Sequence, residues 1–250
     1  MKLDHVSVNL GGCPILKDIS VHAQAGEVTG ILGPNAAGKT TLLRTIAGLV
    51  KPAEGTLHLD DQNVVTMRAA KRAASIGFVP QRFRGEVPFT VRQIVAMGAR
   101  HRGPSEARHA VDGALETCEL SELASRPFAT LSVGQQQRAV IARALAQISS
   151  PGVLLLDEPL AALDLRYAST ILGIIRQRAR QGDTVIVSLH DLGIASASCD
   201  QAWLLSDGQL EAAGPPDTVL SEDRLERVYG ARFERLQRQD GRDWIIPATA

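Results

Sequence analysis

The stretch Gly33-Pro34-Asn35-Ala36-Ala37-Gly38-Lys39-Thr40-Thr41 decides how the rest of the chain is interpreted. It follows a short apolar run, residues 28–32, that is typical of a buried strand, and it precedes residues 42–49, whose apolar positions recur at helical spacing. A glycine-rich loop in this position turns successive backbone N–H groups toward a phosphate chain, beside the positive end of the helix dipole. Lys39 adds a charge for the β- and γ-phosphates, and the Thr40 hydroxyl is a magnesium ligand. The loop therefore predicts a phosphate site; the alternative is a glycine-rich turn that only caps a helix.

The composition predicts a globular chain without a strong overall charge. Its 250 residues are 44% hydrophobic, which is enough for a sizeable core. The 27 basic and 27 acidic side chains balance, so no net field attracts nucleic acid, and we expect no nucleic-acid partner. Three scattered cysteines are too few for a disulfide framework and indicate reduced thiols. The start of the chain lacks an apolar signal stretch, and no run approaches the roughly 18 apolar residues of a membrane span. Any membrane association is therefore expected to come through a partner.

The first third of the chain carries the patterns of a mixed α/β fold. Alternating apolar residues in 3–10, a Gly-Gly turn and residues 15–23 predict an antiparallel hairpin. Residues 56–59 and 75–79 predict two further strands, and residues 82–88 predict a loop.

The middle of the chain changes from strand to helix and back. Between Thr90 and Gln147 the strand signal disappears and helical periodicity replaces it, which predicts a helical insertion in an α/β core. Residues 153–156 and 185–189 then predict buried strands with a helix over 167–180 between them. This alternation indicates parallel strands joined by helical crossovers.

The last part of the chain predicts two hairpins and a helix. Residues 202–212 form a hairpin pattern around Ser206-Asp207-Gly208. A helix is predicted over 218–229, and a terminal hairpin over 233–246 around Asp240-Gly241. We therefore expect a small α/β extension after the core.

Two carboxylates follow a predicted parallel strand directly. Asp157 and Glu158 come after residues 153–156, and so lie at the carboxyl edge of the sheet, where such folds bind ligands. Neighbouring residues at a strand end point in different directions. Asp157 is therefore predicted to hold magnesium through water, while Glu158 addresses an attacking water. The alternative is a solvated strand end with no chemical role.

A further string precedes a strongly helical run: Leu131-Ser132-Val133-Gly134-Gln135-Gln136-Gln137-Arg138. On its own, a Ser before a Gly at a helix start indicates an N-cap or an anion site. The string resembles the signature motif of the ATP-binding-cassette (ABC) ATPases, and the order of motifs along nearly the whole chain resembles that family too. These motifs are the phosphate loop, Gln81, the signature, Asp157-Glu158-Pro159, Ala161-Ala162-Leu163-Asp164 and His190.

The resemblance implies a fold and a domain organisation. The fold is α/β, a P-loop NTPase (RecA-like) core with an antiparallel β subdomain and an inserted α-helical subdomain. One domain would fill the chain, with a nucleotide-binding core at 1–85 and 149–215. The helical subdomain would cover 86–148, and the C-terminal α/β extension 216–250.

The resemblance also implies roles for the matching residues. ATP and Mg²⁺ are the implied cofactors, and the phosphates would be bound by Gly33, Pro34, Asn35, Ala36, Ala37, Gly38, Lys39, Thr40 and Thr41. The metal would be held by Thr40, Gln81 and Asp157. Glu158 would be the general base and His190 the γ-phosphate switch, with Lys39 and Gln81 assisting. Two subunits would face head to tail, so that Ser132, Gly134 and Gln135 of one complete the phosphate site of the other.

Within the family, the chain resembles ATP-binding subunits of bacterial importers for metal chelates. The resemblance is carried by residues 90–100, by Trp203-Leu204-Leu205 and by residues 225–230. It implies a permease dimer that docks near residues 81–92, indirectly a substrate-binding protein, and a peripheral place on the cytoplasmic face of the bacterial inner membrane. Haem, ferric siderophores and cobalamin stay open as cargo, since no residue here contacts it.

Three positions depart from the family pattern. Ala36 stands where a glycine is usual, Val133 replaces the first glycine of the signature pair, and Leu10 stands near the usual adenine-stacking aromatic. We therefore expect weak discrimination between ATP and GTP. The alternatives are a soluble ABC ATPase of iron–sulfur cluster assembly, an ATP-binding subunit of another transporter class, and a non-hydrolysing scaffold. The intact Lys39 and Glu158 argue against the scaffold.

Overall fold

The computed structural model describes residues 1–81, 88–161, 163–237 and 243–248. The predicted loop at 82–88 therefore falls almost entirely outside the described residues. Ala162 and the predicted turn at Asp240-Gly241 lie outside them as well.

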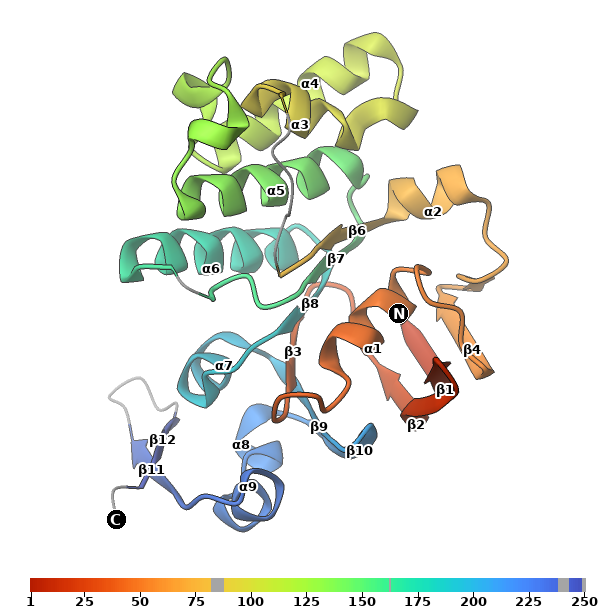
Figure 1. Ribbon diagram of the computed structural model, residues 1–250, viewed down its shortest axis with the longest axis vertical. Coiled ribbons are helices and arrows are strands. Elements are labelled where there is room, and N and C mark those ends of the chain that lie inside the picture. Colours follow the sequence, from red (N-terminus) through yellow and green to blue (C-terminus); the bar gives the residue numbers. More distant parts are fainter. Residues whose placement is uncertain (82–87, 162, 238–242, 249–250) are drawn as a thin grey trace.

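Two large sheets, a two-stranded sheet near the end of the chain and the helices around them form the described part of the protein (Figure 1). The larger sheet has the strand order β10-β9-β3-β8-β7-β6. Its strands are β3 (Val28–Leu32), β6 (Ile76–Val79), β7 (Val153–Leu156), β8 (Thr184–Ser188), β9 (Gln201–Ser206) and β10 (Gln209–Gly214). The smaller sheet has the order β2-β1-β4-β5, with β1 (Lys2–Leu10), β2 (Cys13–His22), β4 (Glu54–Leu59) and β5 (Gln62–Asn63).

The larger sheet is parallel except at one edge. β6, β7, β8, β3 and β9 pair in parallel, and β10 pairs antiparallel with β9. Nearly every residue of β3, β6, β7 and β8 is buried, as the continuous apolar runs predicted. The parallel strands bring their carboxyl ends to one edge of the sheet. The predicted hairpins of β1 with β2 and of β9 with β10 are also confirmed.

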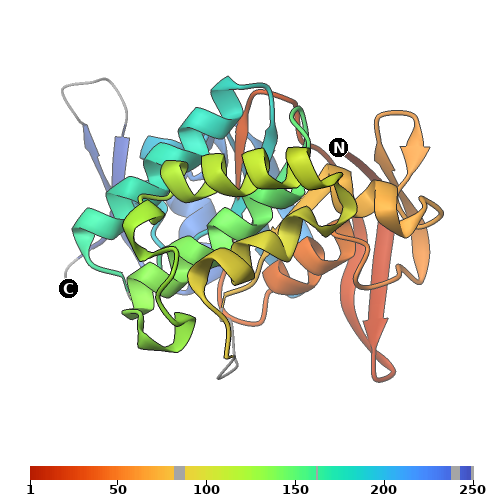
Figure 2. The same cartoon turned by 90° about the horizontal axis from the view of Figure 1, so that it is seen from above.

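The helices lie on both faces of this sheet. α1 (Lys39–Ile46) follows β3, and α6 (Leu165–Arg180) and α7 (Leu192–Ser198) follow β7 and β8. α3 (Val91–Ala96), α4 (Pro104–Thr117) and α5 (Val133–Gln147) lie in front of the sheet in Figure 2, as the helical periodicity predicted. Short 3-10 turns connect them: η1 (Gly98–His101), η2 (Ser121–Leu123) and η3 (Phe128–Thr130).

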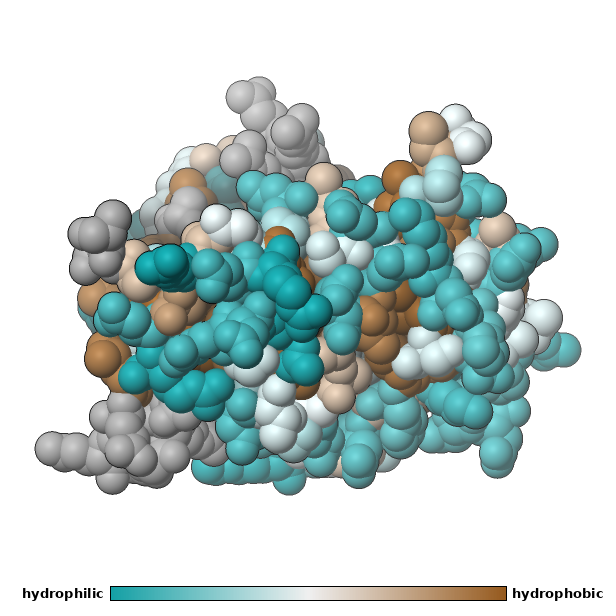
Figure 3. Space-filling model, turned by 90° about the horizontal axis from the view of Figure 1, so that it is seen from below, coloured by the Kyte–Doolittle hydropathy of each residue, from teal (hydrophilic) through white to brown (hydrophobic). Residues whose placement is uncertain are grey.

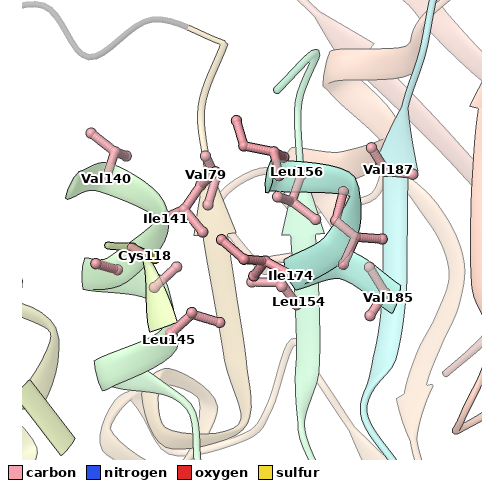
Figure 4. Close-up of a cluster of buried hydrophobic side chains, with 14 of the residues drawn as sticks. Val79, Cys118, Val140, Ile141, Leu145, Leu154, Leu156, Ile174, Val185 and Val187 are labelled. Atoms are coloured by element: carbon pink, nitrogen blue, oxygen red, sulfur yellow. The ribbon is translucent and has the colours of Figure 1, made fainter. Parts of the chain in front are cut away.

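One hydrophobic core joins these helices to the sheet. In Figure 4, Ile141 of α5 lies beside Val79 of β6, and Ile174 of α6 lies over Leu154 of β7. The same cluster continues through α7 to Val219, Leu220 and Leu225. A second cluster fills the space between the two sheets and α1. The helices of the insertion are therefore packed on the sheet and not separated from it.

The sequence interpretation missed α7, β5 and one further helix, and it joined two helices into one. A helix, α2 (Ala69–Ser75), precedes β6 and was not predicted, because none of its residues is buried and its sequence lacks an apolar face. The predicted helix over 218–229 is two helices, α8 (Pro216–Val219) and α9 (Glu222–Tyr229). They separate at Leu220, whose side chain is fully buried, and the Arg224 guanidinium donates to the Thr218 and Val219 carbonyls at the end of α8.

The chain ends in the predicted hairpin of β11 (Phe233–Gln237) and β12 (Asp243–Pro247), which is confirmed for the described residues. Within those residues, each helix is too short or too polar to cross a bilayer. The face seen from below is mainly hydrophilic, with hydrophobic residues in smaller areas between (Figure 3).

Candidate functional site

The loop between β3 and α1 has the backbone that a phosphate cradle needs. Gly33, Ala36 and Gly38 have φ angles of 142°, 64° and 101°. Only glycine fits at Gly33, because a Cβ there would lie 2.1 Å from the Leu205 carbonyl oxygen. Ala36 holds the left-handed conformation with a methyl group, at the position where the family usually has glycine. The loop curls around a cavity of about 270 Å³, lined among the described residues by Ile15, Asn35, Ala36, Ala37, Gly38, Lys39, Thr40, Thr41 and Glu158.

Lys39 is held inside this loop. Its side-chain Nζ donates to the carbonyl oxygens of Gly33 (2.7 Å) and Pro34 (2.9 Å), and the residue is only 5% exposed. Burial lowers the pKa of Lys39, while the nearby Glu158 and Asp157 carboxylates oppose that change. The loop thus places a cation where the phosphates of a nucleotide would lie.

Asp157 lies at the end of β7 and is 2% exposed. Its Oδ1 accepts hydrogen bonds from the hydroxyls of Thr40 (3.1 Å) and Ser188 (2.9 Å). A hydroxyl and a carboxylate oxygen side by side fit Mg²⁺, which is usually bound by one or two carboxylates, with water and substrate phosphates completing the shell. No group of three His, Cys, Asp or Glu side chains within the described ranges could hold a metal by itself. The donor set therefore suits a cation that arrives with a phosphate ligand.

Glu158 adopts a left-handed backbone conformation, with φ 47°. Its N–H donates to the Ser188 Oγ at 2.8 Å. Its carboxylate accepts a hydrogen bond from the Gln81 side chain and lies 2.5 Å from His190 Nε2. A strained residue at the rim of a polar cavity is typical of a functional site. Gln81 and His190 thus both contact the carboxylate of Glu158, the predicted general base.

Ser188 is the site residue that the sequence interpretation missed. Its hydroxyl is fully buried, donates to Asp157 and accepts from the Glu158 backbone, so it connects the two carboxylate residues. The available signal was a single polar residue within the apolar run 185–189. That signal alone does not separate a site residue from an ordinary serine at a strand end.

The signature residues lie elsewhere. Ser132 is the N-cap of α5 and Gln135 its third residue; the Ser132 Oγ accepts from the Gln135 N–H, and the Gln135 Oε1 accepts from the Ser132 N–H. Gly134 lies against the Tyr167 ring, since a Cβ there would be 3.0 Å from Tyr167 Cδ2. Val133 beside it is 65% exposed. Ser132, Gly134 and Gln135 are not part of the described lining of the Lys39 cavity.

The hairpin of β1 and β2 supplies the apolar side of the cavity through Ile15. Leu10, the position named from the sequence, ends β1 opposite Cys13 and is 44% exposed. An aliphatic side chain from this hairpin therefore lies at the site.

The phosphate loop follows β3, and the carboxylate pair follows β7, which is separated from β3 in the sheet only by β8. A parallel sheet with these two features at its carboxyl edge defines a nucleoside-triphosphatase of the P-loop class. Residues 16–161 match the family described as ABC transporter, and the chain belongs to this family. Its enzymatic activity is that of an ABC-type ATPase, and its cofactor is ATP.

Relatives and solved structures agree with this assignment. The chain is 40% identical to the hemin import ATP-binding protein HmuV of Rhodococcus jostii (strain RHA1), over 95% of this chain and 82% of that protein. It is 36% identical to the protein of the same name in Rhodopseudomonas palustris (strain BisA53), over 99% and 94% of the two chains.

Among solved structures, it resembles a metal-chelate type ABC transporter in an inward-facing conformation. The TM-score is 0.84 at 25% identity, over 99% of this chain and 97% of the other. It also resembles a dimeric ATP-binding cassette in a post-hydrolysis state with ADP and Pi. There the TM-score is 0.76 at 30% identity, over 86% and 98%.

Proposed function

We propose that this chain is the ATP-hydrolysing subunit that powers uptake of a metal chelate through a membrane permease, and that the chelate is haem. The observation that carries the proposal is the 40% identity to a hemin import ATP-binding protein over 95% of the chain. The site is compatible with that role, because the loop cation, the buried Asp157 and the Glu158 contacts lie around one cavity.

The hydrolytic step follows from the contacts of Glu158. Its carboxylate, at the rim of the cavity, accepts the proton of a water that attacks the γ-phosphate. Gln81 and His190 hold that carboxylate from two sides. Mg²⁺ would be held by Thr40, Gln81 and Asp157, and it supplies charge neutralisation on the phosphate oxygens when bound.

The assembly is a homodimer that binds a permease dimer. Ser132, Gly134 and Gln135 lie outside the subunit's own cavity, and they complete the phosphate site of the opposite subunit. ATP closes this dimer and hydrolysis releases it, which is a population shift that can move an attached permease. The permease docks near residues 81–92 on the cytoplasmic face of the bacterial inner membrane, and a substrate-binding protein delivers the chelate to it.

The chain works as a single domain in this assembly. The nucleotide-binding core is 1–85 and 149–215, the helical subdomain is 86–148, and the α/β extension is 216–250.

The test is reconstitution of the chain with candidate permeases in lipid vesicles, followed by uptake of labelled haem, cobalamin and ferric siderophore. We expect ATP-dependent uptake of haem, and no uptake with the matched Lys39→Ala chain. Uptake of another chelate would overturn the haem assignment. Failure to co-fractionate with any multi-span protein from solubilised membranes would instead favour a soluble ABC ATPase.

A further inference from the structure

The C-terminal hairpin of β11 and β12 packs on α7 (Figure 1). The contact joins the Trp244 ring to Gly193: a Cβ built on Gly193 would lie 2.4 Å from Trp244 Cε2 and 2.8 Å from Cδ2 and Nε1. The ring therefore rests directly on the helix backbone. Ile245, the next residue of β12, is 5% exposed and belongs to the main hydrophobic core. The ring is thus next in the chain to a residue that is anchored in the core.

The position of α7 is set by tertiary packing, of which this contact is one part. The helix has seven residues, and helices this short depend on tertiary packing more than on their own hydrogen bonds. Glycine is also a poor helix former, so Gly193 weakens the first turn. The glycine makes room for the Trp244 ring, because any side chain at position 193 would clash with that ring.

The first turn of α7 continues directly from His190. Asp191 is the N-cap, and its Oδ1 accepts from the Ile194 N–H at 2.8 Å. His190, one residue earlier, lies 2.5 Å from the Glu158 carboxylate through its Nε2. Ile194 lines a cavity of about 220 Å³ together with Glu158 and His190. His190 is only three residues before Gly193 in the chain. A displacement of Gly193 would therefore change the contact between His190 and Glu158.

The same part of the chain also approaches the phosphate loop. The Tyr229 hydroxyl at the end of α9 is buried. Burial raises the pKa of Tyr229 to about 12, and the Gly33 backbone acts in the opposite direction.

We propose that Trp244 is a positioning residue for ATP hydrolysis: by packing on Gly193 it fixes the first turn of α7 and so holds His190 against Glu158. This inference rests on the proposed roles of Glu158 and His190, but not on the cargo. Loss of haem uptake in the assay above would therefore leave it unaffected.

The kinetic test compares three variants of the full chain. Trp244→Ala removes the ring, Gly193→Ala displaces it while improving the helix propensity, and Trp244→Phe keeps an aromatic ring. We expect both alanine variants to lose about tenfold in kcat with KM for ATP little changed, because a small misplacement of a catalytic group lowers turnover strongly. Trp244→Phe should recover most of the rate. The double alanine variant should be no slower than the slower single variant, since both act on one contact.

A spectroscopic test separates positioning from simple stabilisation. The chain has two tryptophans, and Trp203 is only 2% exposed within β9. In a Trp203→Phe chain, Trp244 is the only tryptophan. We expect the addition of ATP and Mg²⁺ to shift the wavelength of its fluorescence emission. The same addition to a chain that also carries Lys39→Ala should not. If Trp203→Phe does not fold, acrylamide quenching of the wild-type chain reports on half-buried Trp244 in its place.

A residue that only stabilises the fold would behave differently. Trp244→Ala would then lower Tm but leave kcat unchanged below the transition, and ATP would not alter Trp244 emission. Either result would overturn the proposal, provided that equilibrium dialysis shows nucleotide bound. A His190→Ala chain serves as the reference: if it hydrolyses ATP at the wild-type rate, the role on which the inference rests is wrong.

Discussion

Glu158 combines a left-handed backbone with contacts to three other side chains of the site. Such a conformation costs on the order of 1–3 kcal/mol and persists only where the surroundings enforce it. The Ser188 hydroxyl supplies part of that enforcement through the Glu158 N–H. The orientation of the carboxylate is therefore fixed by the backbone as well as by its partners.

Glu158→Gln tests the role of the carboxylate with little change in shape. The amide oxygen can still face His190, but it cannot accept a proton from water. We expect ATP binding to be retained and turnover to fall roughly 10²–10⁴-fold, the range for a positioned proton acceptor. Single-turnover hydrolysis and nucleotide titration measure the two quantities. Near-normal turnover would remove Glu158 from the mechanism.

Ala36 is the second residue whose backbone conformation has a measurable consequence. The left-handed conformation costs an alanine about 1–2 kcal/mol, whereas glycine adopts it freely. Since glycine loses more chain entropy on folding, by about 0.5–1 kcal/mol, we expect Ala36→Gly to raise the free energy of unfolding by about 0.5–1 kcal/mol. Urea denaturation measures it.

The matched control for this substitution is Ala37→Gly. Ala37 is 2% exposed and lies outside the left-handed region, so the change should destabilise the chain. Equal effects at both positions would contradict the explanation from backbone conformation.

At the scale of elements, we expect the hairpin of β1 and β2 to contact the base of the nucleotide. Ile15 lines the cavity, and Leu10 at the turn is 44% exposed. An aromatic ring under a base contributes roughly 1–3 kcal/mol, which aliphatic contact does not fully replace. We expect weak discrimination between ATP and GTP, and tighter ATP binding by Leu10→Tyr, by less than that range. Titrations of the wild-type and Leu10→Tyr chains with ATP and with GTP measure these affinities. A strong preference for ATP that does not respond to Leu10→Tyr would mean that residues outside this hairpin hold the base.

The elements that could be predicted are those whose buried residues appear in the sequence as an apolar run or as a periodic apolar pattern. The four-residue apolar run at 153–156 is buried at every position and was predicted as a strand for that reason. α2 buries nothing and so leaves no such trace, and the break at Leu220 interrupts a helix without a proline or glycine to mark it. Ser188 and Trp244 were missed because their roles depend on partners about 30 and 50 residues away in the chain, which no local pattern records.

At the scale of the whole molecule, the separation of Ser132 from the Lys39 cavity predicts sharing between subunits. A mixed dimer of Ser132→Arg and Lys39→Ala chains confines both lesions to one of its two sites, so the other stays intact. We expect this dimer to close on ATP better than either variant homodimer, as measured by sedimentation. Equal failure of all three would argue against the head-to-tail arrangement.

The hydrophobic core that joins the inserted helices to the sheet also contains two thiols. The rate at which these thiols are alkylated measures how often the core opens. Cys118 directly follows α4 and Cys199 directly follows α7. Both are buried in this core, and burial raises the pKa of Cys118 to about 12. Exposed Cys13 should be alkylated by N-ethylmaleimide immediately on mixing. Cys118 and Cys199 are buried, so we expect them to react only when the core opens. If the core opens as one unit, peptide mass spectrometry will find a single shared rate for Cys118 and Cys199. Faster labelling of Cys118 alone would mean that the inserted helices open while the sheet stays closed.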